Sequence, residues 1–447
     1  WKVETLGKPL GDLAAAGDTP ALLRAAALDA LAELGGANKP AIEGLTKSAS
    51  SEVRPLAVAA LARLDVNAAS VAAASALRDA APGQDFAAML APFLSARGGP
   101  ESLAKALEAA NLPPDPAKLG LRALYALGSS NAPLVDVLSK AAKISGDVKP
   151  PSKEEIEKLL ADVAAKGDPA RGERVFRRAD LNCMKCHAVA GAAGGVGPEL
   201  SAVGSSSPVD YLINSIMVPD QAIKEEFVTK VVQTADGRVF HGIVADKDDK
   251  RLVLREATGE LRTIPADEID ATKDGGSLMP KGLVNFVTRA EFVDLLRFLS
   301  ELGKPGPYAI HTTPTIQRWR LLKPVPSSPD EALKADPAHW LPVYALVPGT
   351  LPLDELAAQS GSPVLYLRGD VNVTAAGPVG FRLGSGEGVS TWVDGHQADG
   401  TSFTAELDPG VHTLTLRVDT AANKAPLKVE VVKPEGSSAE FTVVGGR

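Results

Sequence analysis

Apolar residues recur every three or four positions through the first third of the chain, which is the spacing of an amphipathic helix. Two such stretches, residues 23–35 and 53–65, align without a gap at an offset of 30 residues, the separation of Arg24 from Arg54. The apolar residues that coincide in this alignment are Leu28 with Val58, Leu31 with Leu61, and Leu34 with Leu64. Helical repeats of this length predict stacked helix pairs over residues 1–150.

A third and looser copy of the repeat covers residues 119–128. The repeats resemble those of HEAT-type α-solenoids, and an irregular helical bundle is the alternative interpretation. We find no cluster of acids, bases or nucleophiles in this part of the sequence. Scaffolding or partner binding is therefore the role that we expect of it.

Helical spacing returns within residues 151–303, where the predicted helix starts carry capping residues. Asp168 and Pro169 predict the start of one helix, because Asp accepts hydrogen bonds at an N-cap and Pro suits the first turn. Thr288 and Glu291 form a capping box before the last helix of this region. That helix is predicted to bury one apolar stripe, formed by Phe292, Leu295, Leu296 and Leu299.

Two other parts of the chain alternate apolar and polar residues with the period of two that is typical of strands. Residues 226–270 hold four or five short runs separated by turn signals, which predicts a small β-barrel of the SH3-like or Sm-like kind. In this barrel Leu252 and Leu254 should face one way, and the opposite face should carry Arg251, Val253 and Arg255.

The C-terminal residues 363–447 predict a β-sandwich. The preceding residues 304–362 are rich in proline with short apolar pieces, and we interpret them as an ordered connector. The fold class predicted for the whole chain is therefore multidomain α+β.

Length and charge narrow the classes of function. A chain of 447 residues is too long for one ordinary core, so about three domains are expected. The net charge of -8 and the isoelectric point near 5.5 argue against a nucleic-acid partner, which requires a basic surface. No apolar run approaches the ~20 residues of a membrane span. Because the chain starts at Trp1 rather than at a methionine, we expect a processed or excised product.

The only two cysteines, Cys183 and Cys186, stand immediately before His187 in the sequence CMKCH. C-x-x-C-H is the attachment signature of c-type haem. Two thiols three positions apart on a helical turn can each form a thioether with one porphyrin vinyl group, and the histidine can then bind the iron. A redox dithiol or a zinc site is the alternative, although the first favours a βαβ context and the second needs further ligands. We therefore predict one covalently bound haem c.

A low-spin electron carrier needs a sixth iron ligand, and methionine is the usual choice because its thioether favours Fe(II). Met89 lies in the helical repeats, Met184 lies inside the attachment turn, and Met217 has the spacing of a core residue. Met279 stands in a loop bounded by glycine and proline, GGSLMPKGL, and is the ligand that we predict. His241, on a predicted strand, is the runner-up.

Residues 168–303 resemble a class I cytochrome c, and more narrowly the haem-binding domain of planctomycete and verrucomicrobial proteins. The likeness extends back to about residue 97. The segments that carry it are GDPARGERVF, CMKCH, GPEL, YLINSIMVPD, DGRVFHGIV, SLMP and the last helix. As in that family, the predicted barrel is interpreted as an insert between the proximal loop and the loop of Met279.

The resemblance also implies roles for single residues. The Pro198 carbonyl would accept a hydrogen bond from the His187 ring, and Leu200 would pack on the porphyrin. Gly172 and Phe176 match the first helix of the family, where a small residue lets the last helix cross closely.

The function implied by the resemblance is one-electron transfer by a monohaem cytochrome in the periplasm or outside the cell. A redox partner protein, a dehydrogenase or an upstream domain would supply the electron, and Lys185 and Lys281 would steer an acidic partner. We expect an electron carrier rather than an enzyme. If Met279 does not bind iron, an open-site haem enzyme or a sensor of peroxide or a small gas is the alternative. A surface-binding scaffold with an accessory haem is another.

The predicted sandwich faintly resembles protective-antigen-type carbohydrate-binding modules, in LDPGVHTLTLRVD and VDG. A glycan or a surface protein is its expected partner. We interpret Trp392 as a core residue, and a stacking surface for a sugar is the alternative. We interpret Asp394 as a turn residue, and a calcium ligand is the alternative.

Overall fold

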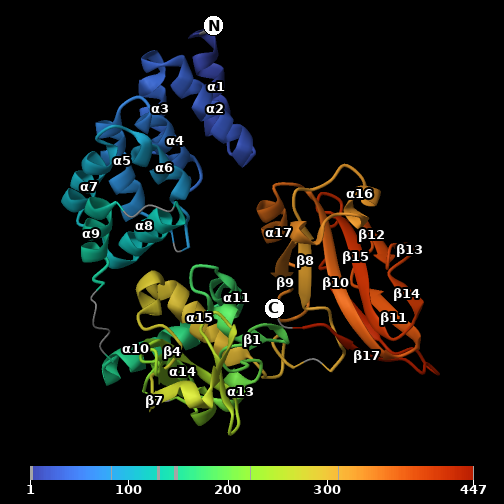
Figure 1. The fold of residues 1–447 in the computed structure, drawn as a ribbon. Helices are drawn as coiled ribbons and strands as arrows, with labels where there is room; N and C mark the ends of the chain where they lie inside the picture. The colour runs from blue at the N-terminus through green and yellow to red at the C-terminus, as the bar shows by residue number, and fades with distance from the viewer. Residues whose placement is uncertain are drawn as a thin grey trace. The chain divides into compact units, whose positions relative to one another are not determined.

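The protein combines α-helices with several antiparallel sheets, as the computed structural model in Figure 1 shows. The structure describes residues 4–81, 83–127, 131–144, 150–221, 223–310 and 312–445. Gly128, the last residue of the third predicted repeat, and both chain ends lie outside these ranges. None of the described helices is both long and apolar enough to cross a membrane.

The chain forms two compact units. The first contains the described residues of Trp1–Ser152 together with Ile216–Val218 and Lys281–Val293. The second contains the described residues of Lys153–Ser215, Pro219–Pro280 and Asp294–Arg447.

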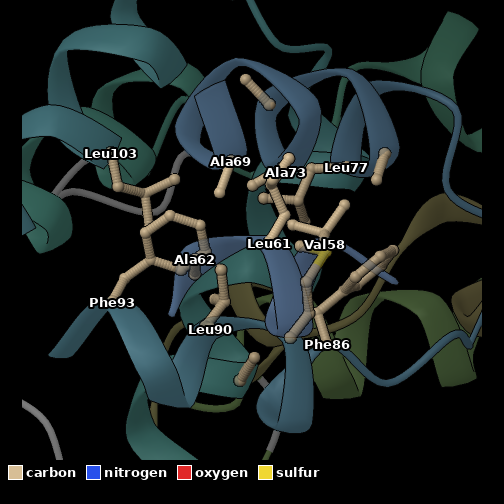
Figure 2. Close-up of a cluster of buried hydrophobic side chains, with 14 of the residues drawn as sticks. Val58, Leu61, Ala62, Ala69, Ala73, Leu77, Phe86, Leu90, Phe93 and Leu103 are labelled. Carbon is tan, nitrogen blue, oxygen red and sulfur yellow. The ribbon is translucent and has the colours of Figure 1, made fainter. Parts of the chain in front are cut away.

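The first unit is built mainly from the alanine- and leucine-rich helices of the N-terminal region. Their bounds are η1 Glu4–Leu6, α1 Gly7–Ala15, α2 Ala21–Leu34, η2 Gly36–Asn38, α3 Lys39–Leu45, α4 Val53–Ala62, α5 Val66–Arg78, α6 Ala87–Ser95, α7 Gly99–Ala110, α8 Pro114–Ala126 and α9 Ala132–Ala141. They share one hydrophobic core. Figure 2 shows side chains from several helices converging there, among them Leu61 of α4, Leu77 of α5 and Phe93 of α6. The aligned residues Leu28, Leu31, Val58 and Leu61 are all buried in it.

The helices around the cysteine motif pack at close range. Their bounds, with those of two short strands, are α10 Lys153–Lys166, α11 Pro169–Arg177, α12 Cys183–Cys186, β1 Ala188–Val189, β2 Ala192–Ala193, α13 Val203–Ser206, α14 Val209–Met217, η5 Leu283–Phe286 and α15 Arg289–Glu301. Asp168 caps α11 by accepting from the Arg171 N–H at 2.8 Å, as predicted. A Cβ on Gly172 would lie 2.0 Å from the Asp294 carbonyl oxygen, so only glycine allows α11 and α15 to cross here.

The capping box predicted for α15 is present, and it is reciprocal. The Glu291 N–H donates to Thr288 Oγ1 at 3.2 Å, and the Thr288 N–H donates to Glu291 Oε2 at 2.9 Å. The predicted stripe of Phe292, Leu295, Leu296 and Leu299 is buried.

Five antiparallel strands follow α14 in the second unit. Their bounds, with those of two 3-10 turns, are η3 Glu225–Phe227, β3 Thr229–Thr234, β4 Val239–Lys247, β5 Arg251–Arg255, β6 Leu261–Pro265, η4 Ala266–Glu268 and β7 Ile269–Asp274. The sheet order is β6-β5-β4-β3-β7, so the last strand returns beside the first. Leu252 and Leu254 are in its core, as expected. Val253 does not belong to this core cluster but is buried as well, so the opposite face of the strand is also covered at its centre.

The C-terminal part of the chain forms two antiparallel sheets around one core. Its elements are β8 Arg318–Leu322, α16 Pro329–Leu333, η6 Pro337–His339, β9 Trp340–Tyr344, α17 Leu353–Ser360, β10 Val364–Ala375, β11 Gly377–Leu383, β12 Val389–Val393, β13 His396–Ala398, β14 Ser402–Leu407, β15 Gly410–Asp419, β16 Val429–Val432 and β17 Glu440–Val443. The larger sheet has the order β13-β12-β15-β10-β8-β9 with β17 also paired to β10, and the smaller has β14-β11-β16.

Residues 304–362 do more than connect two domains, which corrects the interpretation from sequence. Leu321 of β8 pairs with Leu367 of β10, and Trp319 is fully buried in the core shared with the two sheets. Strand β8, RWRLL, is only five residues long, contains two arginines and is soon followed by Pro324 and Pro326, so its periodicity is too short to mark a central strand.

A buried carboxyl on α11 contacts this C-terminal part. Glu173, 4% exposed, accepts a hydrogen bond at 2.6 Å from the Val347 N–H. Arg177, one turn later, donates to the carbonyls of Tyr344 and Ala345 at 2.7 and 2.9 Å. Burial raises the pKa of Glu173 from 4.5 to about 7, and the Val347 hydrogen bond opposes this shift.

We therefore expect the Glu173→Gln variant to gain stability over the unmutated protein as the pH rises from about 4.5 to 7. In the unmutated protein, the Glu173 carboxyl is neutral in both the folded and the unfolded state below pH 4.5. Above this pH it ionises first in the unfolded chain, which lowers the free energy of unfolding by up to about 3 kcal/mol at pH 7 and above. Unfolding by guanidinium chloride, followed by tryptophan fluorescence at pH 4.5 and 7.5, measures this because Trp319, Trp340 and Trp392 all lie in the C-terminal sheets. Glu387→Gln, at an exposed site, is the control. A difference that does not change with pH contradicts the expectation.

Candidate functional site

Helix α12 places both cysteines on a single helical turn. It begins after Asn182, whose φ of 55° lies in the left-handed region, and it ends at His187, whose backbone is extended. The His187 N–H donates to the Cys183 carbonyl at 2.8 Å, which closes the turn. Cys183 and Cys186 are thiols rather than a disulfide, and both are partly exposed. Burial raises the pKa of Cys183 to about 11, whereas dithiol redox enzymes lower the pKa of their reactive cysteine.

The loop that follows folds back over the cysteine turn. The Gly194 N–H donates to the Met184 carbonyl at 3.0 Å, and the Gly197 N–H donates to the Cys186 carbonyl at 2.8 Å. A Cβ on Gly197 would lie 2.8 Å from Cε1 of His187, so the loop backbone touches the imidazole ring directly. The sequence GGVG is what permits this approach.

The same loop fixes the orientation of the imidazole. Nδ1 of His187 lies 2.8 Å from the Pro198 carbonyl oxygen, which is the contact that the resemblance implied. Because a carbonyl can only accept, Nδ1 carries the proton and Nε2 presents its lone pair. Burial lowers the pKa of His187, against an opposing effect of the Pro198 hydrogen bond, so the ring is neutral at pH 7. The side chain is thus in the tautomer and protonation state that a metal requires.

Leu200 lies at the end of this loop and is half-buried. Its N–H donates to the Ala188 carbonyl at 2.9 Å, which returns the chain to the strand that follows His187. Pro198 is likewise half-buried. The structure therefore brings Pro198 and Leu200 into the loop that is folded on the cysteine turn.

Met279 lies between β7 and η5 in a loop that is anchored at its start. Asp220 accepts from the Ser277 N–H at 2.7 Å, and Ser277 Oγ accepts from the Met279 N–H at 3.1 Å. The hydroxyl of Thr229, which is fully buried, donates to the Gly276 carbonyl at 2.7 Å. The Met279 side chain itself is half-buried.

Asp220 and Thr229 were not identified from the sequence as parts of the site. Asp220 ends the segment YLINSIMVPD, where a proline followed by an acid signals a turn but gives no indication of its distant partner. Thr229 had no distinguishing signal.

The structure also describes the surroundings of the other candidates for a sixth ligand. Nε2 of His241 lies 2.7 Å from Thr229 Oγ1, so this ring is engaged within the five-stranded sheet. Met89 is fully buried in the core of the first unit, and Met184 is in the cysteine turn itself. Met217 ends α14, and its side chain is half-buried.

The remaining predicted residues are also placed. Lys185 and Lys281 are exposed. Trp392 is only 8% exposed, which agrees with a packing role. Asp394, with a φ of 49°, accepts hydrogen bonds from His412 Nδ1 at 2.6 Å and from the Thr413 N–H at 2.8 Å, so its carboxylate holds a turn.

No protein-family model matches the chain, and no curated protein matches it at a significant level.

We expect Gly197→Ala to loosen the loop over His187, because the new methyl would overlap the ring and overpacking of this kind costs about 1–3 kcal/mol. Hydrogen exchange measured by mass spectrometry should show about tenfold or greater acceleration at residues 194–200. Gly17→Ala is the matched control, since a Cβ there has no neighbour within 4 Å among the described residues. Equal exchange of the loop in the two variants would show that the ring contact is not tight.

Proposed function

We propose that this protein is a monohaem c-type cytochrome that carries out one-electron transfer outside the cytoplasm. The observation that supports this most strongly is the C-x-x-C-H motif on one helical turn, with Nδ1 of its histidine hydrogen-bonded to the Pro198 carbonyl. A histidine that is merely buried in a core does not need two cysteines on the preceding turn and a carbonyl that fixes its tautomer.

The residues fit a covalently bound haem. Both cysteines are thiols on the same turn and are reachable from solvent, as thioether formation with two vinyl groups requires. His187 is neutral and presents Nε2 to a metal, while Pro198 holds the ring in that orientation. When bound, haem supplies an iron that exchanges one electron between Fe(III) and Fe(II). In this proposal the protein residues make no bond to a substrate. They tether the haem, orient the iron ligands and shield the haem from solvent.

Met279 is the proposed sixth ligand. It is half-buried on a loop whose backbone is hydrogen-bonded to Asp220 and Ser277, so the backbone from which its thioether extends is anchored. A thioether stabilises Fe(II) and raises the reduction potential. Leu200 is the proposed apolar contact of the porphyrin.

The proposed architecture follows the same resemblance. We assign residues 1–150 to a HEAT-like solenoid and residues 151–303 to a class I-like cytochrome c domain with an SH3- or Sm-like barrel inserted. The crossing of α11 and α15 at Gly172 supports the second assignment. The sheet order, in which β7 pairs with β3, supports the assignment of the inserted barrel. The C-terminal sheets form the proposed sandwich.

The proposed partners are a redox protein or dehydrogenase that supplies the electron, in the periplasm or outside the cell. A glycan or a surface protein is the proposed partner of the C-terminal sheets. Because Trp392 is buried, a glycan would have to be bound by other residues.

The proposal is tested by the absorption spectrum of protein produced with haem-maturation machinery. We expect covalent low-spin haem, and we expect Met279→Ala to lose the long-wavelength iron–sulfur band and to lower the reduction potential, because water or a weaker donor replaces the thioether. Met217→Ala is the matched control, since this methionine is also half-buried. The iron–sulfur band should persist in the spectrum of this variant.

The outcomes separate the functions that the sequence left open. High-spin haem in the unmutated protein would favour an open-site enzyme or sensor. Loss of the iron–sulfur band in Met217→Ala rather than in Met279→Ala would show that Met217 is the sixth ligand instead of Met279. Absence of covalent haem would contradict the proposed function.

A further inference from the structure

The segment that follows Met279 does not cluster with the residues that precede it. Lys281–Val293 belongs to the first compact unit, together with the N-terminal helices, although Met279 belongs to the second. Within the first unit, helix α8 makes several polar contacts to this segment. The peptide that leads away from the proposed iron ligand is therefore part of the helical unit.

Lys118 of α8 binds two backbone carbonyls of this segment. Its Nζ donates to the Val287 carbonyl at 2.8 Å and to the Val284 carbonyl at 3.2 Å. Val287 follows the last residue of the short helix η5, Leu283–Phe286, and the Val284 carbonyl inside the helix also accepts from the Val287 N–H at 3.3 Å. The Lys118 side chain is only 17% exposed, so these bonds are shielded from solvent.

The other residues along the same stripe of α8 also contact the segment. Asp115 Oδ2 accepts from the Arg289 N–H at 2.9 Å. Arg122 donates to Glu291 at 2.8 Å in an ion pair whose two side chains are both largely buried. The ring of Tyr125 meets the edge of the Phe286 ring at a centroid distance of 6.2 Å.

The spacing of these residues shows that one face of α8 contacts the segment Lys281–Val293. Positions 115, 118, 122 and 125 follow the three- and four-residue steps that place side chains on one stripe. Burial lowers the pKa of Lys118, and the charges of Asp115 and Glu291 oppose this shift only in part. A lysine that only had to solubilise α8 would instead point into solvent.

Backbone contacts therefore lie on both sides of Met279 along the chain, one set within each unit. Asp220 and Thr229 fix the start of its loop at Ser277 and Gly276. Lys118 fixes its end at η5, four or more residues beyond Met279. Loss of the contacts at η5 would lengthen the stretch of backbone around Met279 that has no such anchor.

We propose that α8 positions the Met279 loop, with Lys118 as the central positioning residue and Asp115 and Arg122 beside it. This inference rests on the proposed function of Met279 as an iron ligand. It gives the helical unit a part in setting the strength of the sixth-ligand bond, in addition to any scaffolding role. Displacement of α8 from η5 would weaken that bond without a change in any residue that touches the haem.

The test compares Lys118→Met with Lys105→Met in the haem-loaded full chain. Lys118→Met keeps the length of the side chain and removes the donor. Lys105 is exposed on α7 and makes no hydrogen bond or ion pair with any residue in the described part of the chain. Hydrogen exchange of residues 277–287 should accelerate about tenfold or more in Lys118→Met, because two hydrogen bonds from a charged donor are lost.

A second readout concerns the iron itself. Lys118→Met should bind cyanide about tenfold faster, as displacement of the thioether becomes easier, and should show a weakened iron–sulfur band and a lower reduction potential. Lys118→Arg, which keeps the charge and the donors, should restore part of the effect. Asp115→Asn, a milder change, should shift exchange and cyanide binding in the same direction if Lys118→Met fails to fold.

The outcomes distinguish this inference from the proposed function. If the haem-loaded Lys118→Met and Asp115→Asn variants match Lys105→Met in exchange, cyanide binding and potential, α8 does not position the loop, and the cytochrome proposal is untouched. If the unmutated protein carries no covalent haem, the proposed function and the positioning role fall together. Faster exchange with an unchanged band, cyanide rate and potential would reduce the contact to ordinary packing and overturn the inference.

Discussion

The hydrogen bond between the His187 imidazole and the Pro198 carbonyl is the interaction on which the proposed site depends. It selects the tautomer of the ring and leaves Nε2 as the nitrogen that can bind a metal. The carbonyl can reach Nδ1 only because the loop before it is hydrogen-bonded to the cysteine turn and because Gly197 has no side chain to separate the loop from the ring. The attachment motif and the glycine-rich loop are thus one structural element, although His187 and Pro198 are 11 positions apart.

Close backbone packing supports that element from outside. Gly172 lets α11 lie against the backbone of α15 at Asp294, and Gly204 brings α13 equally close to the carbonyls of Leu299 and Ser300. Larger residues at either position would have to separate helices whose spacing determines where the cysteine turn lies. The first turn of α15 carries a different set of contacts, because Glu291 both caps the helix and pairs with Arg122. Helix α15 therefore packs closely against α11 and α13 from its middle onward, and it makes polar contacts at its first turn.

The sequence predicted what depends on neighbours along the chain. The cap at Asp168, the reciprocal pair of Thr288 and Glu291, and the geometry of the cysteine turn all follow from residues within four positions of one another. It did not predict contacts that join distant segments. Ser277 and Asp220 are 57 positions apart, and Lys118 and Val287 are 169 apart. Side-chain bonds to a remote backbone leave no periodic signal, and strand β8 was missed because its partner lies across a proline-rich stretch.

The central claim is that Cys183 and Cys186 together tether one haem, and the most direct measurement is the denatured intact mass of protein produced with haem-maturation machinery. Addition of a thiol across a vinyl group loses no atoms, so the account predicts the mass of the chain plus that of one haem, retained after unfolding and reduction of disulfides. Peptide mapping should place the added mass on the peptide that contains both cysteines. Cys183→Ser with Cys186→Ser should restore the mass of the bare chain for that variant. An intact mass equal to that of the chain alone, from a protein that is folded, would contradict the account.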